Sequence, residues 1–155
     1  MIYVDIISDM NLFDPSWDAE VDTAGAVLRA TRLGEHVGAR RLAANVYELG
    51  PGAHVSPLHF HHRNEELLFV LSGTPSLRRS ANDLRELAPG EVVAFPTGPD
   101  GTHQIINRSD QPARVLICAT NDLPEVAEQI EADQLAVITD AGLQVLPRGP
   151  MIQAP

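Results

Sequence analysis

The chain has 155 residues, 44% hydrophobic and 21% charged, which suits one globular domain with a buried core and excludes a composition typical of disorder. Its formal net charge of −10, with only 11 Lys and Arg, argues against a nucleic-acid partner, because phosphate backbones are bound by clustered cations. No apolar run reaches the roughly 18 residues of a membrane span, and the acidic N-terminal stretch does not resemble a signal peptide, so we expect a cytoplasmic protein.

The first part of the chain shows a mixed pattern, and we expect residues 1–31 to form an N-terminal arm. Within it, residues 15–20 begin with a proline and predict one turn of helix. A terminal arm can pack on its own domain or on a partner subunit, and the sequence favours neither.

The middle of the chain consists of short apolar runs separated by turns rich in proline and glycine, which number 12 and 11 in the whole sequence. This spacing is typical of an all-β domain. Residues 81–83 separate two of the runs and predict a hairpin. The expected strands cover residues 42–49, 66–71, 77–79, 84–87, 91–95, 103–107 and 113–120.

The one cysteine, Cys118, lies in the apolar run of the last of these strands. A single cysteine excludes an intrachain disulfide and fits a reducing compartment. Nothing near it in the sequence supplies the positive charge that activates a thiol. We therefore interpret Cys118 as a buried, unreactive side chain.

The C-terminal part carries the one clear helix signal after the strands. Residues 124–133 (PEVAEQIEAD) predict a short helix, with Asp122 as its cap and Pro124 in its first turn. The tail at residues 147–155 contains three prolines and is expected to be extended or disordered. Because no repeat or low-complexity segment interrupts the chain, residues 1–155 are expected to form a single domain.

Three histidines and one glutamate form the pattern that points to chemistry. His59 and His61 are two residues apart, so in a strand their side chains share a face. Glu66 begins the next strand after a short turn, and His103 begins another strand after a loop rich in proline and glycine. Three imidazoles and a carboxylate suit a divalent transition metal, such as Zn, Fe, Mn or Ni, and leave coordination positions open.

Other polar residues near this pattern have simpler interpretations. His36 and His54 are read as surface residues, and His62 alternates away from the histidine pair and so lies at a rim. Glu65 competes with Glu66 as the carboxylate ligand, and the strand spacing alone does not choose between them.

The spacing resembles the two sequence motifs of the cupin superfamily. The six residues that separate Glu66 from Gly73 favour Glu66 over Glu65. Relative to the motifs, the chain has one extra residue before His59 and two extra residues before His103, and both additions lengthen loops. The first motif is matched by Gly52, His59, His61, Glu66 and Gly73, and the second by Gly90, Pro96, Gly98, His103 and Asn107.

This resemblance extends over about residues 40–120. The sequence there is similar to that of single-domain cupins labelled mannose-6-phosphate isomerase-like. The resemblance implies a double-stranded β-helix, or jelly-roll barrel, whose interior holds a metal on His59, His61, Glu66 and His103. It also implies a homodimer, paired through barrel edges or swapped terminal strands. The label marks kinship of fold more than activity, because one fold hosts many reactions.

The first functional hypothesis is a metal-dependent enzyme that acts on a small oxygenated metabolite, such as a sugar derivative or a keto acid. Isomerase or lyase chemistry and dioxygenase chemistry both fit the ligand set, although thiol dioxygenases generally lack a ligating glutamate. Isomerisation also needs a general base. The candidates are Glu65 and His62 at the rim, and Tyr47 if its strand turns the side chain inward.

Two other hypotheses stay open at the level of sequence. One is a small-molecule binding or sensing module without turnover. The other is a metal that only stabilises the fold, although a core of this size does not require such stabilisation. Arg78 and Arg79 alternate on one strand, so one of them could face the barrel mouth and favour an anionic substrate. Asn107 either lines the barrel or ends its strand as a turn residue.

Overall fold

The computed structural model describes residues 10–150 and residue 152. Residues 1–9 of the expected arm, and residues 151 and 153–155 of the expected tail, lie outside the described residues. Strands dominate the described part, which confirms the all-β prediction, and its helical structure is limited to α1 (Leu33–His36) and the 3-10 turn η1 (Pro99–Gly101). None of the described helices has the length and hydropathy that crossing a membrane would need.

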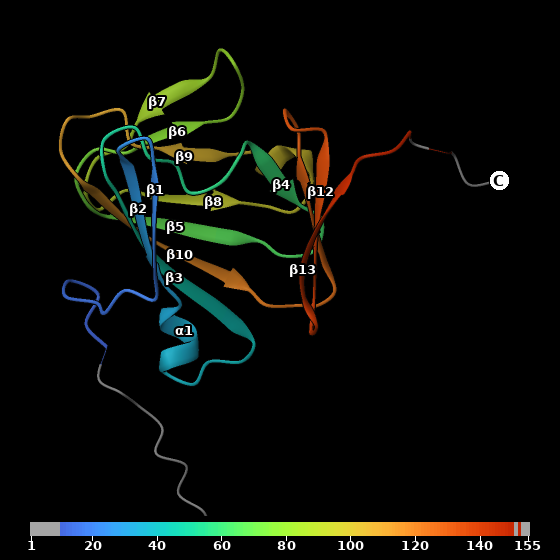
Figure 1. The fold of residues 1–155 in the computed structure, drawn as a ribbon, viewed down its shortest axis with the longest axis horizontal. Coiled ribbons are helices and arrows are strands. Elements are labelled where there is room, and N and C mark those ends of the chain that lie inside the picture. The colour runs from blue at the N-terminus through green and yellow to red at the C-terminus, as the bar shows by residue number, and fades with distance from the viewer. Residues whose placement is uncertain (1–9, 151, 153–155) are drawn as a thin grey trace, which may run out of the picture.

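The largest sheet has six antiparallel strands in the order β1-β2-β3-β10-β5-β8, and it runs across the centre of Figure 1. The central strands β3 and β10 have the bounds that the sequence predicts. The sheet consists of β1 (Ala19–Thr23), β2 (Ala26–Thr31), β3 (Leu42–Leu49), β10 (Ala113–Thr120), β5 (Glu66–Ser72) and β8 (Val92–Phe95).

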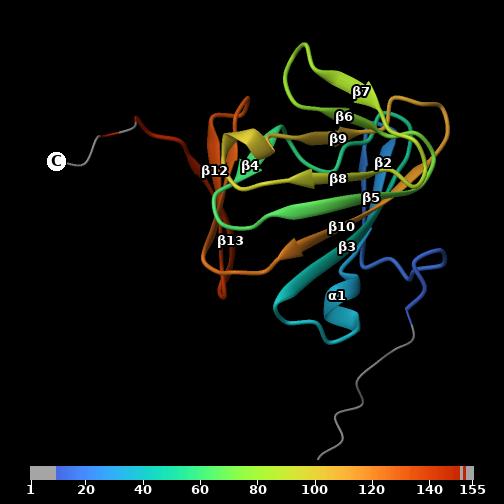
Figure 2. The same cartoon turned by 180° about the vertical axis from the view of Figure 1, so that it is seen from behind.

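Two smaller antiparallel sheets complete the barrel. The C-terminal hairpin β12–β13 stands across one end of the six-stranded sheet, and the predicted hairpin β6–β7 lies on the side away from α1 (Figures 1 and 2). One sheet has the order β13-β12-β11-β4, with β4 at His59–His61, β11 at Glu125–Gln129, β12 at Gln134–Thr139 and β13 at Gly142–Pro147. The other has the order β7-β6-β9, with β6 at Ser76–Arg78, β7 at Leu84–Glu86 and β9 at Gln104–Ile106.

The core lies inside this barrel and follows the period-two alternation of the strands. On β5, Leu68 and Val70 are buried, and on β10 Val115 and Ile117 are buried between more exposed neighbours. Phe95, at the end of β8, is only 2% exposed and joins the same cluster. With few aromatic residues, aliphatic side chains supply most of the buried apolar area that stabilises the fold.

The predicted helix at residues 124–133 is wrong, because this segment contains strand β11. Its alanine and glutamate content favours a helix, but the segment pairs with β4 on one side and with β12 on the other. Glu125 and Ala127 are buried on one face of the strand, as a period of two requires. Tertiary pairing therefore overrides the local helix propensity.

The N-terminal arm is also more regular than expected. The predicted helical turn at residues 15–20 is wrong, since this segment is extended and leads into β1. The hairpin β1–β2 turns at Ala24 and Gly25, both with positive φ, and then extends the sheet next to β3. Arg29 ties the three strands together through ion pairs of 2.6 Å to Glu20 and 3.1 Å to Glu48.

Asn107 follows β9, is fully buried, and organises the turn that leads to β10. Its Nδ2 donates to the carbonyl oxygens of Leu49 (2.8 Å) and Gln111 (2.7 Å), and its Oδ1 accepts from the backbone N–H (3.0 Å) and the hydroxyl (2.7 Å) of Ser109. All of its side-chain hydrogen-bonding groups are thus used by the turn, so of the two interpretations the turn residue is correct.

Replacing Asn107 with alanine is expected to lower the free energy of unfolding by about 2 kcal/mol, because it leaves buried carbonyl groups without their donor. Urea unfolding followed by circular dichroism measures this loss. The matched control is Asn82→Ala in the exposed β6–β7 turn, which should change stability by less than about 0.5 kcal/mol. Equal effects for the two variants would contradict the role given to Asn107.

Candidate metal centre

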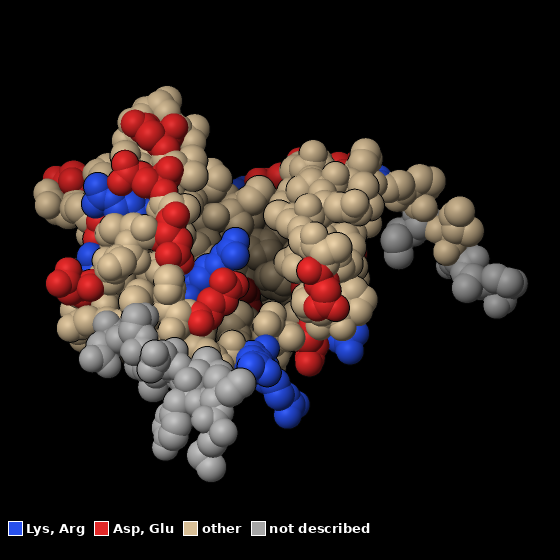
Figure 3. Space-filling model, turned by 60° about the horizontal axis from the view of Figure 1, so that its bottom comes forward, with Lys and Arg blue, Asp and Glu red and all other residues tan. Residues whose placement is uncertain are grey.

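A cavity of about 290 Å³ lies inside the barrel, and all four predicted ligands line it. Strands β3, β4, β5, β9, β10, β11 and β12 contribute its walls. Figure 3 shows the face on which the surface is hollowed between the six-stranded sheet and the C-terminal strands, with acidic and basic side chains beside the hollow. The volume suits a small metabolite rather than a macromolecular segment.

His59 and His103 are held side by side by the backbone. Each donates its backbone N–H to the carbonyl oxygen of the other, at 3.1 and 2.9 Å, and their ring centroids are 4.5 Å apart. Each ring then donates Nδ1–H to a neighbouring carbonyl oxygen at 2.8 Å, that of Pro57 for His59 and that of Gly101 for His103. Because a carbonyl can only accept, each Nε2 carries a lone pair.

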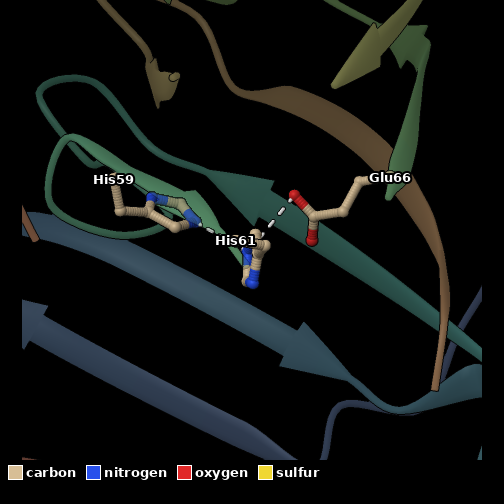
Figure 4. Close-up of side chains that lie close together, drawn as sticks. All are labelled: His59, His61 and Glu66. Atoms are coloured by element: carbon tan, nitrogen blue, oxygen red, sulfur yellow. Dashed lines mark hydrogen bonds and ion pairs between the residues drawn. The ribbon is translucent and has the colours of Figure 1, made fainter. Parts of the chain in front are cut away.

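His59, His61 and Glu66 form a cluster whose ligand atoms all lie within 4.8 Å of one another (Figure 4), and His103 adjoins this cluster at Glu66. The Nε2 atoms of His59 and His61 are 3.1 Å apart, and His61 Nε2 lies 3.5 Å from Glu66 Oε2. His103 Nε2 lies 3.1 Å from the same oxygen. Glu66 Oε2 is buried and has no hydrogen-bond partner among the described residues.

This geometry fits a metal ion. A tetrahedral ion with bonds of about 2.0–2.1 Å separates neighbouring ligand atoms by about 3.3 Å, and the measured separations of 3.1 and 3.5 Å lie on either side of that value. Opposed lone pairs in a buried site repel one another unless a cation lies between them. Imidazole nitrogens with one carboxylate form the donor set of divalent transition metals.

The protonation states also suit metal binding. Burial, with a smaller contribution from the neighbouring imidazoles of His103 and His61, lowers the pKa of His59 to about 4, so its ring is neutral at physiological pH. Burial disfavours a charged Glu66, but His103 and the other imidazoles outweigh it and hold the pKa of this carboxyl below its usual range. A neutral imidazole and an ionised carboxylate are the forms that bind metals.

The two extra residues before His103 have a structural use. The loop that they lengthen contains the three-residue turn η1, which brings the carbonyl oxygen of Gly101 to His103 Nδ1. On the other side, the Phe95 ring stacks on the His103 ring with centroids 3.7 Å apart and planes inclined by 10°. The ring of His103 is thereby held in orientation from two directions.

Tyr47 does face inward and lines the cavity beside Asn45, two residues away on β3. Burial and the charge of Glu66 raise the pKa of the Tyr47 hydroxyl to about 12. At neutral pH the phenol keeps its proton and acts as a hydrogen-bond donor, so it does not suit the expected role of general base. Asn45 was not predicted, although the alternation that places Tyr47 also places Asn45.

His62 and Glu65, the other two candidates for a general base, are exposed and do not line the cavity. His62 alternates away from His61 and contacts Glu128 on β11, with 2.8 Å between Nε2 and Oε1. Glu65 precedes Glu66 in an extended segment and therefore points to the opposite side. The structure gives neither residue access to a substrate in the cavity.

The two arginines predicted near the barrel mouth do not line the cavity either. Arg78 pairs with Glu131 and donates to Gln104 Oε1 at 2.9 Å. Arg79 donates to the carbonyl oxygen of Asp100 at 3.2 Å and covers the outer face of Phe95. Among the described residues, no guanidinium lines the cavity for an anionic substrate, and the 155 residues contain no lysine.

The remaining sequence interpretations concern residues away from the centre. His36 and His54 are exposed, as expected, and His36 Nε2 lies 2.7 Å from Asp18 Oδ1. Cys118 is half-buried rather than buried, and burial raises the pKa of its thiol, which keeps it in the unreactive form. Sequence reasoning missed Glu125, which lines the cavity from β11, because its segment was assigned to a helix.

Comparisons with known proteins support the same fold. The family described as Cupin domain matches residues 45–119. A sugar phosphate isomerase from a cupin superfamily, solved from Silicibacter pomeroyi, is 29% identical with a TM-score of 0.74, over 82% of this chain and 81% of that chain. A putative sugar phosphate isomerase from Acidithiobacillus ferrooxidans is 25% identical with a TM-score of 0.74, over 84% and 83% of the two chains.

A third solved structure, a polyketide cyclase from Streptomyces resistomycificus, is 26% identical to the chain with a TM-score of 0.60. This match covers 77% of the present chain and 84% of the cyclase. No curated protein matches the chain.

Proposed function

The chain belongs to the cupin superfamily, with its cupin domain at residues 45–119, and from this premise we propose that it is a metal-dependent isomerase or lyase for a small oxygenated metabolite. The observation that carries the proposal is the set of inward lone pairs on the cavity wall. His59 and His103 have their Nδ1 atoms occupied by carbonyl groups, and their Nε2 atoms lie 3.1 Å from His61 Nε2 and 3.1 Å from Glu66 Oε2, respectively.

The cavity has the features that a small, hydroxylated or carbonyl-bearing substrate requires. Tyr47 and Asn45 present a hydroxyl and an amide from β3, and Ile105 and Ile117 form apolar wall that excludes water. Two of the similar structures are named as sugar phosphate isomerases, which supports an isomerase class. We propose a sugar derivative or keto acid as the substrate. No arginine lines the cavity among the described residues, so the metal would bind a carboxylate or carbonyl oxygen, and neutral side chains would contact the other oxygen atoms.

His59, His61, Glu66 and His103 would hold the ion, which would be Zn, Fe, Mn or Ni. When bound, such an ion would supply Lewis-acid polarisation of a carbonyl oxygen. Tyr47 holds a proton at its Oη and donates it to a substrate oxygen as a hydrogen bond, and its high pKa keeps that proton in place between turnovers. Asn45 positions a neighbouring oxygen of the substrate through its amide.

Replacing Tyr47 with phenylalanine is expected to lower turnover by about 100-fold or more, since it removes the phenol hydroxyl that lines the cavity as a proton donor. The assay loads the purified protein with Zn or Mn and incubates it with a panel of aldoses, ketoses and keto acids in D₂O. Proton NMR then measures deuterium incorporation next to the carbonyl group.

Elemental analysis provides the control for this experiment, because Tyr47→Phe should bind as much metal as the wild-type chain. A metal-loaded wild-type protein that exchanges no proton on the panel, but is stabilised by one of its members, would replace the enzyme proposal with a binding module. Oxygen consumption with an iron-loaded protein would replace it with a dioxygenase.

A further inference from the structure

Glu125 is a buried carboxylate that the ligand set does not use. It begins β11, beyond the segment that matches the cupin family, and its side chain is only 2% exposed. No arginine pairs with it among the described residues. Its oxygens instead accept the backbone N–H groups of His62 (3.2 Å), Arg63 (3.1 Å), Asn64 (2.7 Å) and Val126 (2.7 Å).

Three of these donors belong to consecutive residues, so the turn after β4 folds around the carboxylate. Successive N–H groups that converge in this way make an anion-binding concavity. The arrangement compensates the loss of water around a buried negative charge. Because the turn starts immediately after His61, Glu125 also fixes the backbone from which that imidazole projects.

The other side of the carboxylate faces the ring of His61. Glu125 Oε2 lies 3.9 Å from His61 Nδ1, and this nitrogen is buried without a hydrogen-bond partner among the described residues. His59 and His103 differ in this respect, since their Nδ1 atoms each donate to a carbonyl oxygen at 2.8 Å. At 3.9 Å the Glu125 carboxylate is beyond hydrogen-bond distance from His61 Nδ1, but it lies beside the ring nitrogen that corresponds to the Nδ1 atoms bonded to carbonyl groups in the other two histidines.

We propose that Glu125 is the positioning residue for His61: it holds the turn behind the ring and presents a carboxylate to Nδ1, so that Nε2 faces Glu66 and the proposed metal. Carboxylates that accept from the outer nitrogen of a ligating imidazole orient the ring and raise its basicity. The inference rests on the proposed metal site, and it makes the C-terminal sheet part of that site rather than only a cover for it.

The experiment compares Glu125→Gln with Glu128→Gln in the full-length chain. Glu128 lies on the same strand and makes outer contacts with His62 (2.8 Å) and Arg148 (3.0 Å), without contact to a predicted ligand. Co²⁺ affinity is measured by competition with a chelator, and the visible absorption of bound Co²⁺ reports ligand geometry. Urea unfolding of the metal-free proteins measures stability separately.

We expect Glu125→Gln to weaken Co²⁺ binding by about 10- to 100-fold and to shift the Co²⁺ absorption. Glu128→Gln should leave affinity within about twofold of wild type. In a His61→Ala background the effect of Glu125→Gln on affinity should shrink to less than about threefold, because the ring that it positions is gone. Glu125→Asp keeps the charge on a shorter side chain and should recover part of the affinity.

Each other outcome has a distinct meaning. Wild-type affinity in Glu125→Gln, or an equal loss in the His61→Ala background, would overturn the positioning role and leave the metal site standing. A wild-type chain that binds no Co²⁺ would overturn the metal site and this role together. If Glu125→Gln does not fold, Glu125→Asp is tested in both backgrounds, and a loss that does not depend on His61 would overturn the proposal.

Discussion

Replacing His103 with alanine is expected to lower the affinity for a divalent metal by more than about 100-fold. Substitutions of residues that only support metal ligands lower the affinity by about 100-fold at most, and the loss of a ligand should cost more. His103 supplies one lone pair at 3.1 Å from Glu66 Oε2 and is paired with His59 through the backbone. The backbone pairing survives the substitution, so the other ligands stay in place while one donor is lost. Chelator competition with Co²⁺ measures the affinity.

The fold should survive this change. The substitution leaves a gap beside Phe95, which lowers the free energy of unfolding by about 1–2 kcal/mol. It also removes one of the opposed lone pairs, and this relieves repulsion in the metal-free protein. Matched controls are His36→Ala and His54→Ala, two exposed histidines that should keep full metal affinity. If His103→Ala unfolds the chain at room temperature, the metal is a structural staple and not part of a ligand-binding site.

Replacing Gly101 with alanine is expected to destabilise the fold by about 3 kcal/mol and to weaken metal binding as well. An added Cβ would overlap the carbonyl oxygen of Pro96, which is backbone and cannot move aside as a flexible side chain would. Any shift of this turn also moves the Gly101 carbonyl oxygen that accepts from His103 Nδ1. Urea unfolding and Co²⁺ titration measure the two effects.

Gly98→Ala is the matched control, three residues earlier in the same loop. Gly98 has φ +81°, but a methyl group added there would project into open space, so the cost is confined to backbone strain of about 1 kcal/mol. Metal affinity should change little. If both variants lose the same stability and affinity, the close approach to Pro96 is not what makes glycine necessary at position 101.

The strands and the shared face of His59 and His61 could be predicted because both depend on local spacing. β3 and β10 are apolar runs bounded by turn residues, and their observed bounds match the predicted ones. His59 and His61 share a face through the same period of two that exposes His62. For these features, the order of residues along one strand carries the necessary information.

Other features depended on pairing between distant segments. Residues 125–129 have helix-forming composition, and only the contact with β4 and β12 makes them a strand. Glu125 could not be found before that pairing was known. Likewise, alternation shows that Arg78 and Arg79 point to opposite sides of their strand. It does not reveal their partners outside the cavity, which are Glu131 and Gln104 for Arg78 and the Asp100 carbonyl oxygen for Arg79.

The pairing of β4 with β11 has a consequence for the order in which the molecule matures. β4 carries two of the predicted ligands, yet its sheet partner lies more than 60 residues later in the chain. On the ribosome, all four predicted ligands have been synthesised before β11, the strand that pairs with β4, leaves the exit tunnel. Contacts between such distant segments form late in folding, so we expect metal loading to wait for the pairing of β4 with β11 rather than for the synthesis of the ligands themselves.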